Sequence, residues 1–353
     1  MMNDELGAEA HIRKNMKLLI TGTAGFIGFH LTRRLLAEGH DITGLDNLNE
    51  YYDVNLKYAR LRELGIALSS KQKSSESFSL QTGRLHFIRA DLTDKEKLLS
   101  LFRDTSFDQV IHLAAQAGVR YSLDHPQTYV DSNVTGFLNI LEACRRYPVS
   151  HLIYASSSSV YGLNTDFPYS EKDRTDQPAS LYAATKKADE MLAHAYSHLF
   201  SIPITGLRFF TVYGPWGRPD MAFFKFTDAI LHQKPIDVYN HGKMARDFTY
   251  IDDILEGILG VIYKLAPRGN PPCDLYNIGL GNPVNLMEFI RAIESACGEK
   301  AEIRYQNMHP GDVLKTHADI SALQTLCGYH PKTDIQTGMK HFVEWYKNYY
   351  HLL

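Results

Sequence analysis

Tyr182 and Lys186 are the two residues of this 353-residue sequence whose types and spacing point most clearly to chemistry. In the segment Tyr-Ala-Ala-Thr-Lys they lie one helical turn apart, so that a phenol and an ammonium share one helix face. A phenol in water is a poor base at neutral pH, because its pKa is about 10. A neighbouring positive charge stabilises a phenolate. We therefore expect Tyr182 to take a proton from a hydroxyl group while hydride leaves the carbon that carries it.

Four consecutive hydroxyls precede this pair, in the segment Ala-Ser-Ser-Ser-Ser-Val-Tyr-Gly that begins at Ala155 and closes an apolar run. A serine hydroxyl at such a strand end can relay the proton or hold the substrate oxygen. Side chains alternate between the two faces of a strand, and the residues alone leave open which of Ser156–Ser159 serves. A lone Tyr-x-x-x-Lys is common on exposed helices, and the serine-rich strand end makes the pattern specific.

A glycine-rich segment near the N-terminus predicts a dinucleotide site. An apolar run, Lys17–Thr21, is followed by Gly-Thr-Ala-Gly-Phe-Ile-Gly and then by an amphipathic helix. Glycines let the chain turn sharply and approach a pyrophosphate, and the helix N-terminus offers unpaired N–H groups to the phosphates. The strand–glycine–helix order makes the signal strong. The expected cofactor-binding residues of this segment are Gly22, Gly25, Phe26, Ile27 and Gly28.

Asp46 closes the second predicted strand, eighteen residues after Gly28. A carboxylate there accepts hydrogen bonds from both adenosine ribose hydroxyls and repels a 2′-phosphate, and no arginine follows at once to favour that phosphate. The predicted cofactor is therefore NAD rather than NADP. Asp91, with Leu92, closes the third strand and is placed to meet the adenine, although helix capping is an equal alternative for Asp91. Asn47 and Ala114 complete the expected cofactor set.

Alternating strands and helices must position these groups. Apolar runs predict strands at Lys17–Thr21, Asp41–Asp46, Leu85–Asp91, Gln109–Ala114, His151–Ser156 and Ile204–Phe210. Amphipathic stretches between them predict helices at Phe26–Glu38, Lys95–Phe102, Val134–Arg146 and Lys187–Phe200. This alternation is typical of an α/β fold, a doubly wound parallel sheet of Rossmann type covered on both faces. After Phe210 the pattern loosens, which indicates a second, smaller α/β lobe for the substrate.

The expected domain organisation follows from these patterns. Residues 1–15 are polar and are interpreted as a disordered leader or tag, with the native start at Met16. Residues 16–210 form the predicted cofactor domain, in which the serine-rich segment 66–83 is expected to be a flexible surface insertion. Residues 211–353 form mainly the second lobe, with segments near 247–264 packing back on the first domain.

Composition excludes several other classes. The formal net charge of −3 gives no electrostatic reason to expect nucleic acid or an anionic membrane as a partner. No stretch is apolar enough to span a bilayer, and the polar N-terminus lacks the centre of a signal peptide. The four cysteines are scattered, with no pair at metal-ligand spacing, so we expect free thiols in a reducing cytoplasm and no metal.

From Met16 to nearly the C-terminus, these motifs in this order resemble the extended short-chain dehydrogenases/reductases, specifically the NAD-dependent nucleotide-sugar epimerases. In that family the Tyr-x-x-x-Lys pair and a hydroxyl on the preceding strand form the catalytic triad. The resemblance implies Ser157, Tyr182 and Lys186 here, with Tyr182 and Lys186 also contacting NAD. It implies that Ser157 and Ser158 contact the substrate, while the neighbouring serines remain alternatives for the catalytic hydroxyl.

Two segments are similar to those of UDP-glucuronate 4-epimerases: residues 114–122, which contain Arg120, and residues 208–222, which contain Thr211 and Arg218. A uronic acid carries a carboxylate that favours a hydroxyl and a guanidinium nearby, and Thr211 and Arg218 could supply both. A structural role for Arg218, tying down its loop, is the alternative. The resemblance further implies Arg246 at the pyrophosphate, Val238 and Tyr239 around uracil, and Asp312 at the uridine ribose.

Oxidation at carbon four of a uronate gives a β-keto acid, which tends to lose carbon dioxide. An epimerase must hold the carboxylate near the plane of the new carbonyl while the sugar turns to receive hydride on its other face. The expected function is therefore 4-epimerisation of UDP-glucuronate to UDP-galacturonate. A UDP-glucuronate decarboxylase, a 4-epimerase of neutral or N-acetylated UDP-hexoses and an inactive NAD-binding sensor are the alternatives.

A homodimer is the expected assembly. Apolar residues recur at helical spacing in two predicted helices, and one stripe on each could be covered either by the chain's own sheet or by a second copy. The family resemblance favours pairing into a four-helix interface. The residues concerned are Val134, Phe137, Leu138, Leu141 and Cys144 on the first helix, and Met191, Leu192, Ala195, Tyr196 and Leu199 on the second.

Overall fold

A computed structural model describes residues 15–264, 266–308 and 313–352 of the chain. The expectation of a disordered leader concerns residues 1–15, of which 1–14 lie outside the described residues. The predicted ribose ligand Asp312 also lies outside them.

The core of the larger domain is an eight-stranded sheet in the order β12-β7-β6-β5-β1-β2-β4-β3. Every neighbouring pair is parallel except β3 with β4, which is antiparallel. Because both faces are covered, successive side chains of the central strands are buried, rather than every second one. The strands are β1 (Lys17–Thr21), β2 (Asp41–Asp46), β3 (Phe78–Thr82), β4 (Leu85–Arg89), β5 (Gln109–His112), β6 (His151–Ser157), β7 (Ile204–Phe209) and β12 (Cys273–Ile278).

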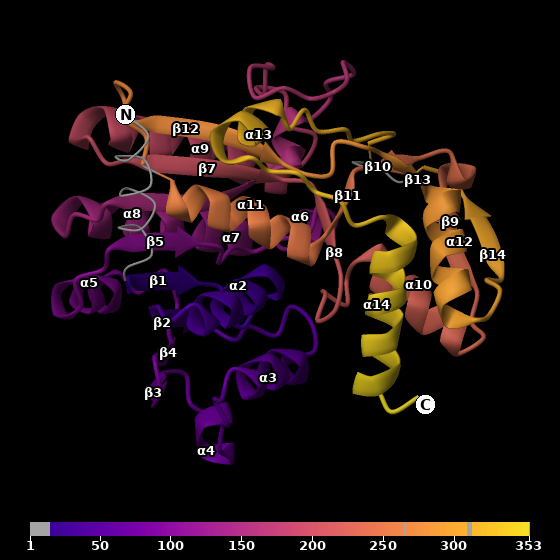
Figure 1. The fold of residues 1–353 in the computed structure, drawn as a ribbon, viewed down its shortest axis with the longest axis horizontal. Coiled ribbons are helices and arrows are strands. Elements are labelled where there is room, and N and C mark those ends of the chain that lie inside the picture. The colour runs from indigo at the N-terminus through magenta and orange to yellow at the C-terminus, as the bar shows by residue number, and fades with distance from the viewer. Residues whose placement is uncertain (1–14, 265, 309–312, 353) are drawn as a thin grey trace, which may run out of the picture.

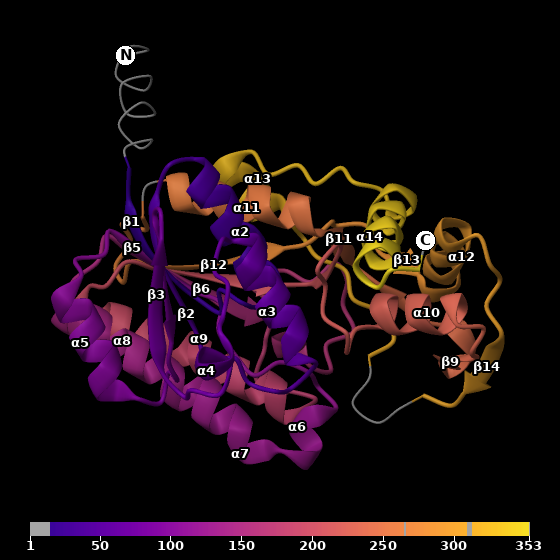
Figure 2. The ribbon, with the colours of Figure 1, turned by 90° about the horizontal axis from the view of Figure 1, so that it is seen from below.

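Helices cover both faces of this sheet (Figures 1 and 2). On one face lie α2 (Phe26–Ala37), α3 (Val54–Glu63), α11 (Ile251–Tyr263) and α13 (Ser321–Cys327). On the other lie α5 (Lys95–Asp104), α8 (Gly136–Arg146), α9 (Leu181–Phe200) and the short helices α6 (Tyr121–Asp124) and α7 (Pro126–Tyr129), which a π-helical turn at Val130–Thr135 joins to α8. The predicted doubly wound α/β fold is confirmed.

The second lobe lies to one side of the sheet, at the right of Figure 1. Its small parallel sheet joins β9 (Ile236–Tyr239) to β14 (Ile303–Gln306). The helices α10 (Ala222–Leu231), α12 (Leu286–Cys297) and α14 (Ile335–Tyr349) pack there, and Phe223, Phe289 and Phe342 are completely buried in its core. Two short pairs, β8 (Thr211–Tyr213) with β11 (Phe248–Tyr250) and β10 (Ala245–Arg246) with β13 (Val284–Asn285), lie between the lobe and the large sheet.

The C-terminal half is not confined to the second lobe. We expected the sheet to end near Phe210, but β12 adds an eighth strand beside β7. Residues 251–263, within the segment expected to pack back on the first domain, form α11 beside α2. The Tyr263 hydroxyl lies 2.9 Å from Nε2 of His40, just after α2, and the Gln109 side chain of β5 donates to the Ile262 carbonyl (3.1 Å).

The segment 66–83 differs from our expectation of a flexible insertion. It contains α4 (Ser70–Lys73) and the edge strand β3, in register with β4 from Phe78 opposite Arg89 to Thr82 opposite Leu85. Serines mask an alternating pattern in which Phe78 and Leu80 pack against the core, with Phe78 beside the Phe87 ring at 5.9 Å. A strand needs only this half-buried alternation to pair at a sheet edge.

Candidate active site

The glycine-rich loop, Asp46 and Ser157, all predicted site residues, lie at the carboxyl ends of parallel strands. The glycine-rich loop follows β1, Asp46 ends β2, and Ser157 ends β6. Carboxyl ends of parallel strands share one edge of a sheet, and ligands bind there where the strand order reverses, which here is between β1 and β5.

A cavity of about 480 Å³ lies at this edge and extends to residues of the second lobe. Most of the predicted site residues line it: Gly22, Gly25, Phe26, Ile27, Gly28, Asp46, Asn47, Asp91, Leu92, Ala114, Ser157, Ser158, Tyr182, Lys186, Thr211, Arg218 and Arg246. The fold thus brings together residues that are as far apart in sequence as Gly22 and Arg246.

The glycine loop is held in one conformation by Asp46. Its carboxylate accepts from the Ala24 amide (3.1 Å) and from the Leu48 amide (2.8 Å). Gly22 has φ +76°, and a Cβ on it would come within 2.9 Å of the Ala114 backbone nitrogen, so glycine is required. Gly25 caps α2 without any side-chain hydrogen bond, which leaves the first N–H groups of the helix available to an anion.

Asp91 organises the neighbouring loop. It accepts hydrogen bonds from the Asn47 side chain (2.8 Å) and from the Thr93 amide (2.9 Å). Burial would raise the pKa of Asp91, but these hydrogen bonds outweigh burial and lower it. The N-cap of α5 is Asp94 and not Asp91, so helix capping does not explain Asp91.

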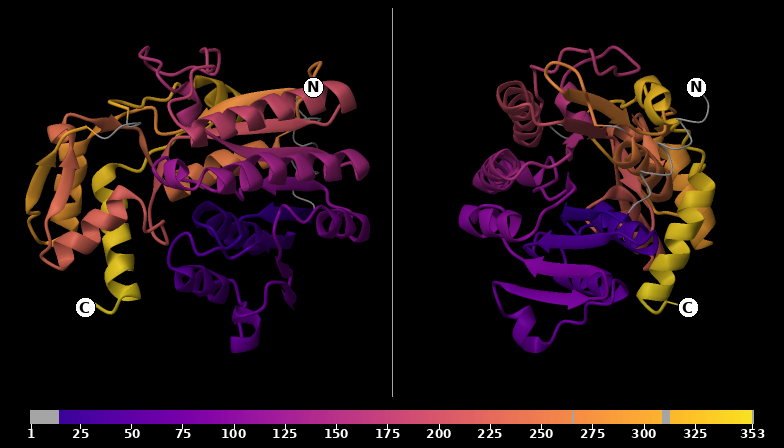
Figure 3. Two further views of the ribbon diagram at one scale, coloured as in Figure 1. Left: turned by 180° about the vertical axis from the view of Figure 1, so that it is seen from behind. Right: turned by 60° about the vertical axis from the view of Figure 1, so that its left-hand side comes forward.

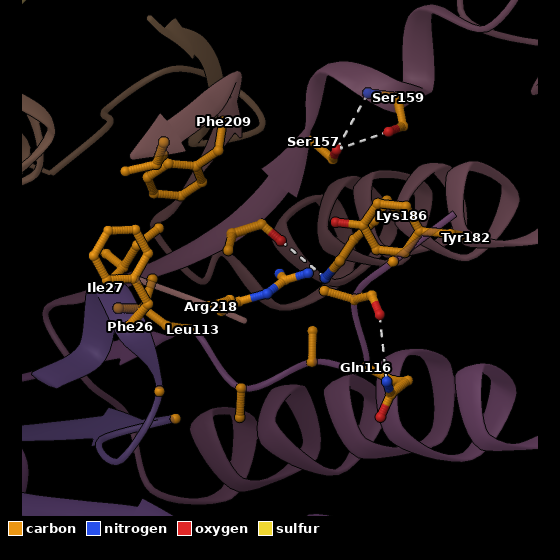
Figure 4. A pocket seen from close by; sticks show the side chains of 18 of the residues that line it. Phe26, Ile27, Leu113, Gln116, Ser157, Ser159, Tyr182, Lys186, Phe209 and Arg218 are labelled. Carbon is orange, nitrogen blue, oxygen red and sulfur yellow. Dashed lines mark hydrogen bonds between the residues drawn. The ribbon is translucent and has the colours of Figure 1, made fainter. Parts of the chain in front are cut away.

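Tyr182 and Lys186 both lie in the first turns of α9, whose N-cap is Ser180. Figure 4 shows both side chains around the same cavity as Arg218, with Ser157 and Ser159 close to them. Lys186 is almost completely buried, and its ammonium donates to the Ala155 carbonyl (3.0 Å) and to Asp189 (3.0 Å). Burial raises the pKa of Asp189 to about 6, although the Lys186 charge opposes the shift.

The four serines after Ala155 have different partners. Ser156 donates to Glu190 (2.7 Å), which also forms a forked ion pair with the buried Arg208. Ser157 caps a short 3-10 helix, η2 (Ser158–Tyr161), and its hydroxyl lies 3.2 Å from both the amide and the hydroxyl of Ser159. The Ser156 hydroxyl therefore belongs to a buried network, although Ser156 lines the cavity as Ser157, Ser158 and Ser159 do.

Arg218 already has a partner inside the cavity wall. Its Nε and Nη2 donate to the two oxygens of Asp220 (3.0 and 2.5 Å), and Tyr51 donates to the same carboxylate (3.1 Å). Burial would raise the pKa of Asp220, but the Arg218 charge and the Tyr51 hydrogen bond lower it. Thr211, the first residue of β8, lines the same cavity.

The predicted nucleotide ligands are placed less uniformly. Arg246 lines the cavity and donates to the carbonyls of Ala245 and Leu314. The exposed Arg120 lies over the Tyr239 ring, 4.5 Å from its centroid, and so links the two lobes. Val238 is completely buried in the core of the second lobe, and neither it, Arg120 nor Tyr239 is among the residues that line the cavity.

Sequence reasoning missed several lining residues. Tyr51 and Tyr52 lie between β2 and α3, and Lys57 lies on α3, so the segment after the carboxyl end of a central strand was an available signal. Gln116, Tyr169 and Thr316 also line the cavity, and nothing in their local sequence marked Tyr169 or Thr316.

The lining residues fit NAD. Glycines and uncapped helical N–H groups suit a pyrophosphate, and the buried Asp46 suits a ribose without a 2′-phosphate. Within the described part of the chain, no cluster of three histidine, cysteine or acidic side chains could hold a metal ion. No helix among the residues described is long and apolar enough to cross a bilayer.

Comparison with known proteins extends these observations. The family model described as "NAD dependent epimerase/dehydratase family" matches residues 18–279. UDP-glucuronate 4-epimerase 4 of Arabidopsis thaliana is 47% identical over 98% of this chain and 79% of its own length. The probable UDP-glucuronate 4-epimerase of Rhizobium meliloti (strain 1021) is 45% identical over 95% of this chain and 98% of its own. The crystal structure of a Bacillus cereus UDP-glucuronic acid 4-epimerase with UDP-glucuronic acid and NAD superposes with a TM-score of 0.84, at 35% identity, over 95% of this chain and 100% of its own.

Proposed function

Because this chain belongs to the NAD dependent epimerase/dehydratase family, we propose that it interconverts UDP-glucuronate and UDP-galacturonate. The chain is an isomerase that uses NAD to invert carbon four of a UDP-sugar. The choice of a uronate rests on Arg218, a guanidinium that lines the same cavity as Tyr182 and Lys186.

We assign the proton transfer to Tyr182, aided by the ammonium of Lys186 and the Ser157 hydroxyl. Tyr182 takes the proton of the carbon-four hydroxyl as that carbon gives up hydride. NAD, when bound, accepts this hydride and supplies it again for the return step. Thr211 and Arg218 hold the carboxylate near the plane of the new carbonyl, where the bond to carbon dioxide overlaps poorly with it. Arg246 holds the pyrophosphate about which the sugar turns.

Incubation with UDP-glucuronate tests the proposal. UDP-galacturonate should form, the same equilibrium mixture should be reached from either sugar, and no NADH should accumulate, because hydride leaves and returns in one site. Chromatography that resolves both uronates from UDP-xylose, with NADH absorbance followed in parallel, checks all three outcomes.

Each alternative gives a different result in that assay. UDP-xylose as the main product would identify a decarboxylase. Conversion of neutral or N-acetylated UDP-hexoses alone would exclude UDP-glucuronate as the substrate. Steady NADH release would indicate a dehydrogenase instead of an epimerase, and the absence of turnover with every UDP-sugar would favour the NAD-binding sensor.

We also propose a homodimer that pairs through α8 and α9, which lie side by side on one side of the protein (Figure 3, left). The apolar row of α8 contributes less than expected, since Phe137, Leu141 and Cys144 are buried in the chain's own core. On α9, by contrast, Met191 and Leu199 are 65% and 66% exposed. A cytoplasmic location, which the free thiols favour, stays a prediction.

The double variant Met191→Glu/Leu199→Glu should therefore be monomeric, while the parent has the mass of two chains by light scattering at micromolar concentration. Two charges in an apolar interface lose their hydration without gaining partners. Leu163→Glu is the matched control, since Leu163 is equally exposed (66%) but lies off these helices. A monomeric parent would refute the dimer.

A further inference from the structure

Arg60, on α3, is a buried arginine. Each of its five N–H donors has an acceptor, and none of these acceptors is a carboxylate. Its side chain is completely buried. Nη1 donates to the Ala24 carbonyl (2.9 Å) and the Tyr52 hydroxyl (2.7 Å), and Nε and Nη2 both donate to the Trp216 carbonyl (3.2 and 2.6 Å). Nη2 also reaches the Gly217 carbonyl (3.3 Å). No carboxylate among the described residues lies within ion-pair distance of it.

A buried charge without a counter-ion is costly, so its contacts must achieve something that an apolar side chain would not. The contacts of Arg60 join two segments that bind different molecules. Ala24 belongs to the glycine loop, and its amide is fixed by Asp46 while its carbonyl is fixed by Arg60. Trp216 and Gly217 directly precede Arg218.

The second segment needs such support. Trp216 has φ +61°, a left-handed conformation that a bulky residue adopts only when its surroundings hold it. Two N–H groups of Arg60 hold its carbonyl, and His30 of α2 donates to the preceding Pro215 carbonyl (2.8 Å). The Trp216 ring packs on Phe29 of α2 and on Trp345 of α14.

We propose that Arg60 is a positioning residue that fixes the segment carrying Arg218 against the glycine loop. Thr211 and Arg218, here called the carboxylate clamp, then keep their position relative to the hydride acceptor while the keto-sugar turns. The proposal rests on the proposed function, because it requires a uronate held by Arg218. It adds that the fidelity of the reaction, not only its rate, depends on a residue that touches neither substrate nor cofactor.

The expected consequence of losing Arg60 is a side reaction. If the clamp shifts, the bond between carbons five and six of the 4-keto intermediate breaks, its electron pair goes to carbon five as an enolate, and carbon dioxide leaves. The enolate takes a proton at carbon five. NAD, when bound, would return the hydride to carbon four, and the proton held by Tyr182 would go to the carbon-four oxygen to give a UDP-pentose. No external oxidant or reductant is needed.

The test compares Arg60→Lys, which retains the charge without the forked geometry, and Arg60→Met with the parent protein at saturating NAD. The ratio of UDP-pentose to UDP-galacturonate formed from UDP-glucuronate should rise about 10-fold or more in both variants, since small misplacements of a clamp have large effects. Arg62→Met is the matched control, because it removes an exposed charge from the same helix and should leave the ratio unchanged.

Tyr52→Phe extends the test to a protein that retains the buried arginine. It removes only the hydroxyl that accepts from Nη1, so the ratio should lie between those of the parent and Arg60→Lys. A ratio equal to that of the parent in Tyr52→Phe and in every Arg60 variant that folds would overturn the proposal and leave Arg60 a purely structural residue. If the parent itself forms no UDP-galacturonate, the proposed function fails instead, which the parent's assay alone decides.

Discussion

Replacing Tyr182 with phenylalanine should lower kcat by roughly 10²- to 10⁴-fold, the range by which a positioned acid–base group accelerates proton transfer. Only the ionisable oxygen is lost, so NAD and UDP-sugar should bind with nearly unchanged affinity. Because the ring is retained, its edge-to-face contact with Tyr129, at 6.1 Å between centroids, should persist. Turnover of UDP-glucuronate and equilibrium binding of NAD and UDP measure the two parts separately.

Tyr161→Phe is the matched control. Tyr161 is the other tyrosine near the serine-rich strand end, and its hydroxyl donates to Asn277 (2.6 Å) in a buried network with Arg208. Its loss should lower thermal stability while kcat stays within a few-fold of the parent. Activity of Tyr182→Phe within a few-fold of the parent would assign the base to another group.

Arg218→Leu should raise the Michaelis constant for UDP-glucuronate about 10-fold or more, since a charge-assisted hydrogen bond contributes roughly 1.5–3 kcal/mol. It should also let part of the keto intermediate lose carbon dioxide, because the carboxylate can then turn out of the carbonyl plane. Binding of UDP alone should barely change, since we assign its phosphates to Arg246. Product analysis and UDP titration check these outcomes.

Asp220 complicates the single variant, because Arg218→Leu removes both hydrogen bonds from Arg218 to that carboxylate. Among the described residues, the Tyr51 hydroxyl is then its remaining side-chain donor. A partly buried carboxylate that has lost its cation destabilises a site by itself. The double variant Arg218→Leu/Asp220→Asn removes the charge together with the clamp and should decarboxylate as the single variant does. If both variants have the same kinetics with UDP-glucuronate as the parent, the assignment of a uronate substrate fails, while the assignment of an epimerase reaction stands. Equal weakening of UDP and UDP-glucuronate, with lower thermal stability, would instead indicate a loop-tethering arginine.

Much of the fold was predictable because its strongest signals are local. The strands β1 and β2 have the predicted bounds, and α2 begins at the predicted Phe26. The apolar run of β1 is followed at once by the glycine-rich loop, which leaves few alternatives for this strand–helix unit. Tyr182 and Lys186 are four residues apart, so a helix at this position is enough to place both side chains on one face. The family and its NAD-dependent chemistry followed from these motifs in order and are confirmed.

The rest depends on contacts between segments far apart in sequence. The pairing of β12 with β7 joins residues 69 positions apart, from Ile204 opposite Cys273, and neither strand's own sequence specifies the other. The partner of Arg218 was missed for a different reason. Asp220 is only two residues away, but whether its carboxylate forks onto the guanidinium depends on a turn and on Tyr51 from another segment. The roles of individual site residues stay predictions for the same reason.

The path of the chain between β7 and β12 has a consequence for synthesis. After β7 the chain builds α10 and β9 of the second lobe, returns through α11 to cover the large sheet, and only then adds β12 to its edge. A nascent chain that has emerged only as far as Phe209 therefore exposes the bare edge of β7 and lacks α11 against α2. Unpaired strand edges of this kind invite association. The larger domain lacks β12 until residues up to Ile278 have left the ribosome, and α13, which covers the same face as α11, emerges later still. A gene fragment cut at the apparent lobe boundary near 210 should therefore aggregate rather than fold.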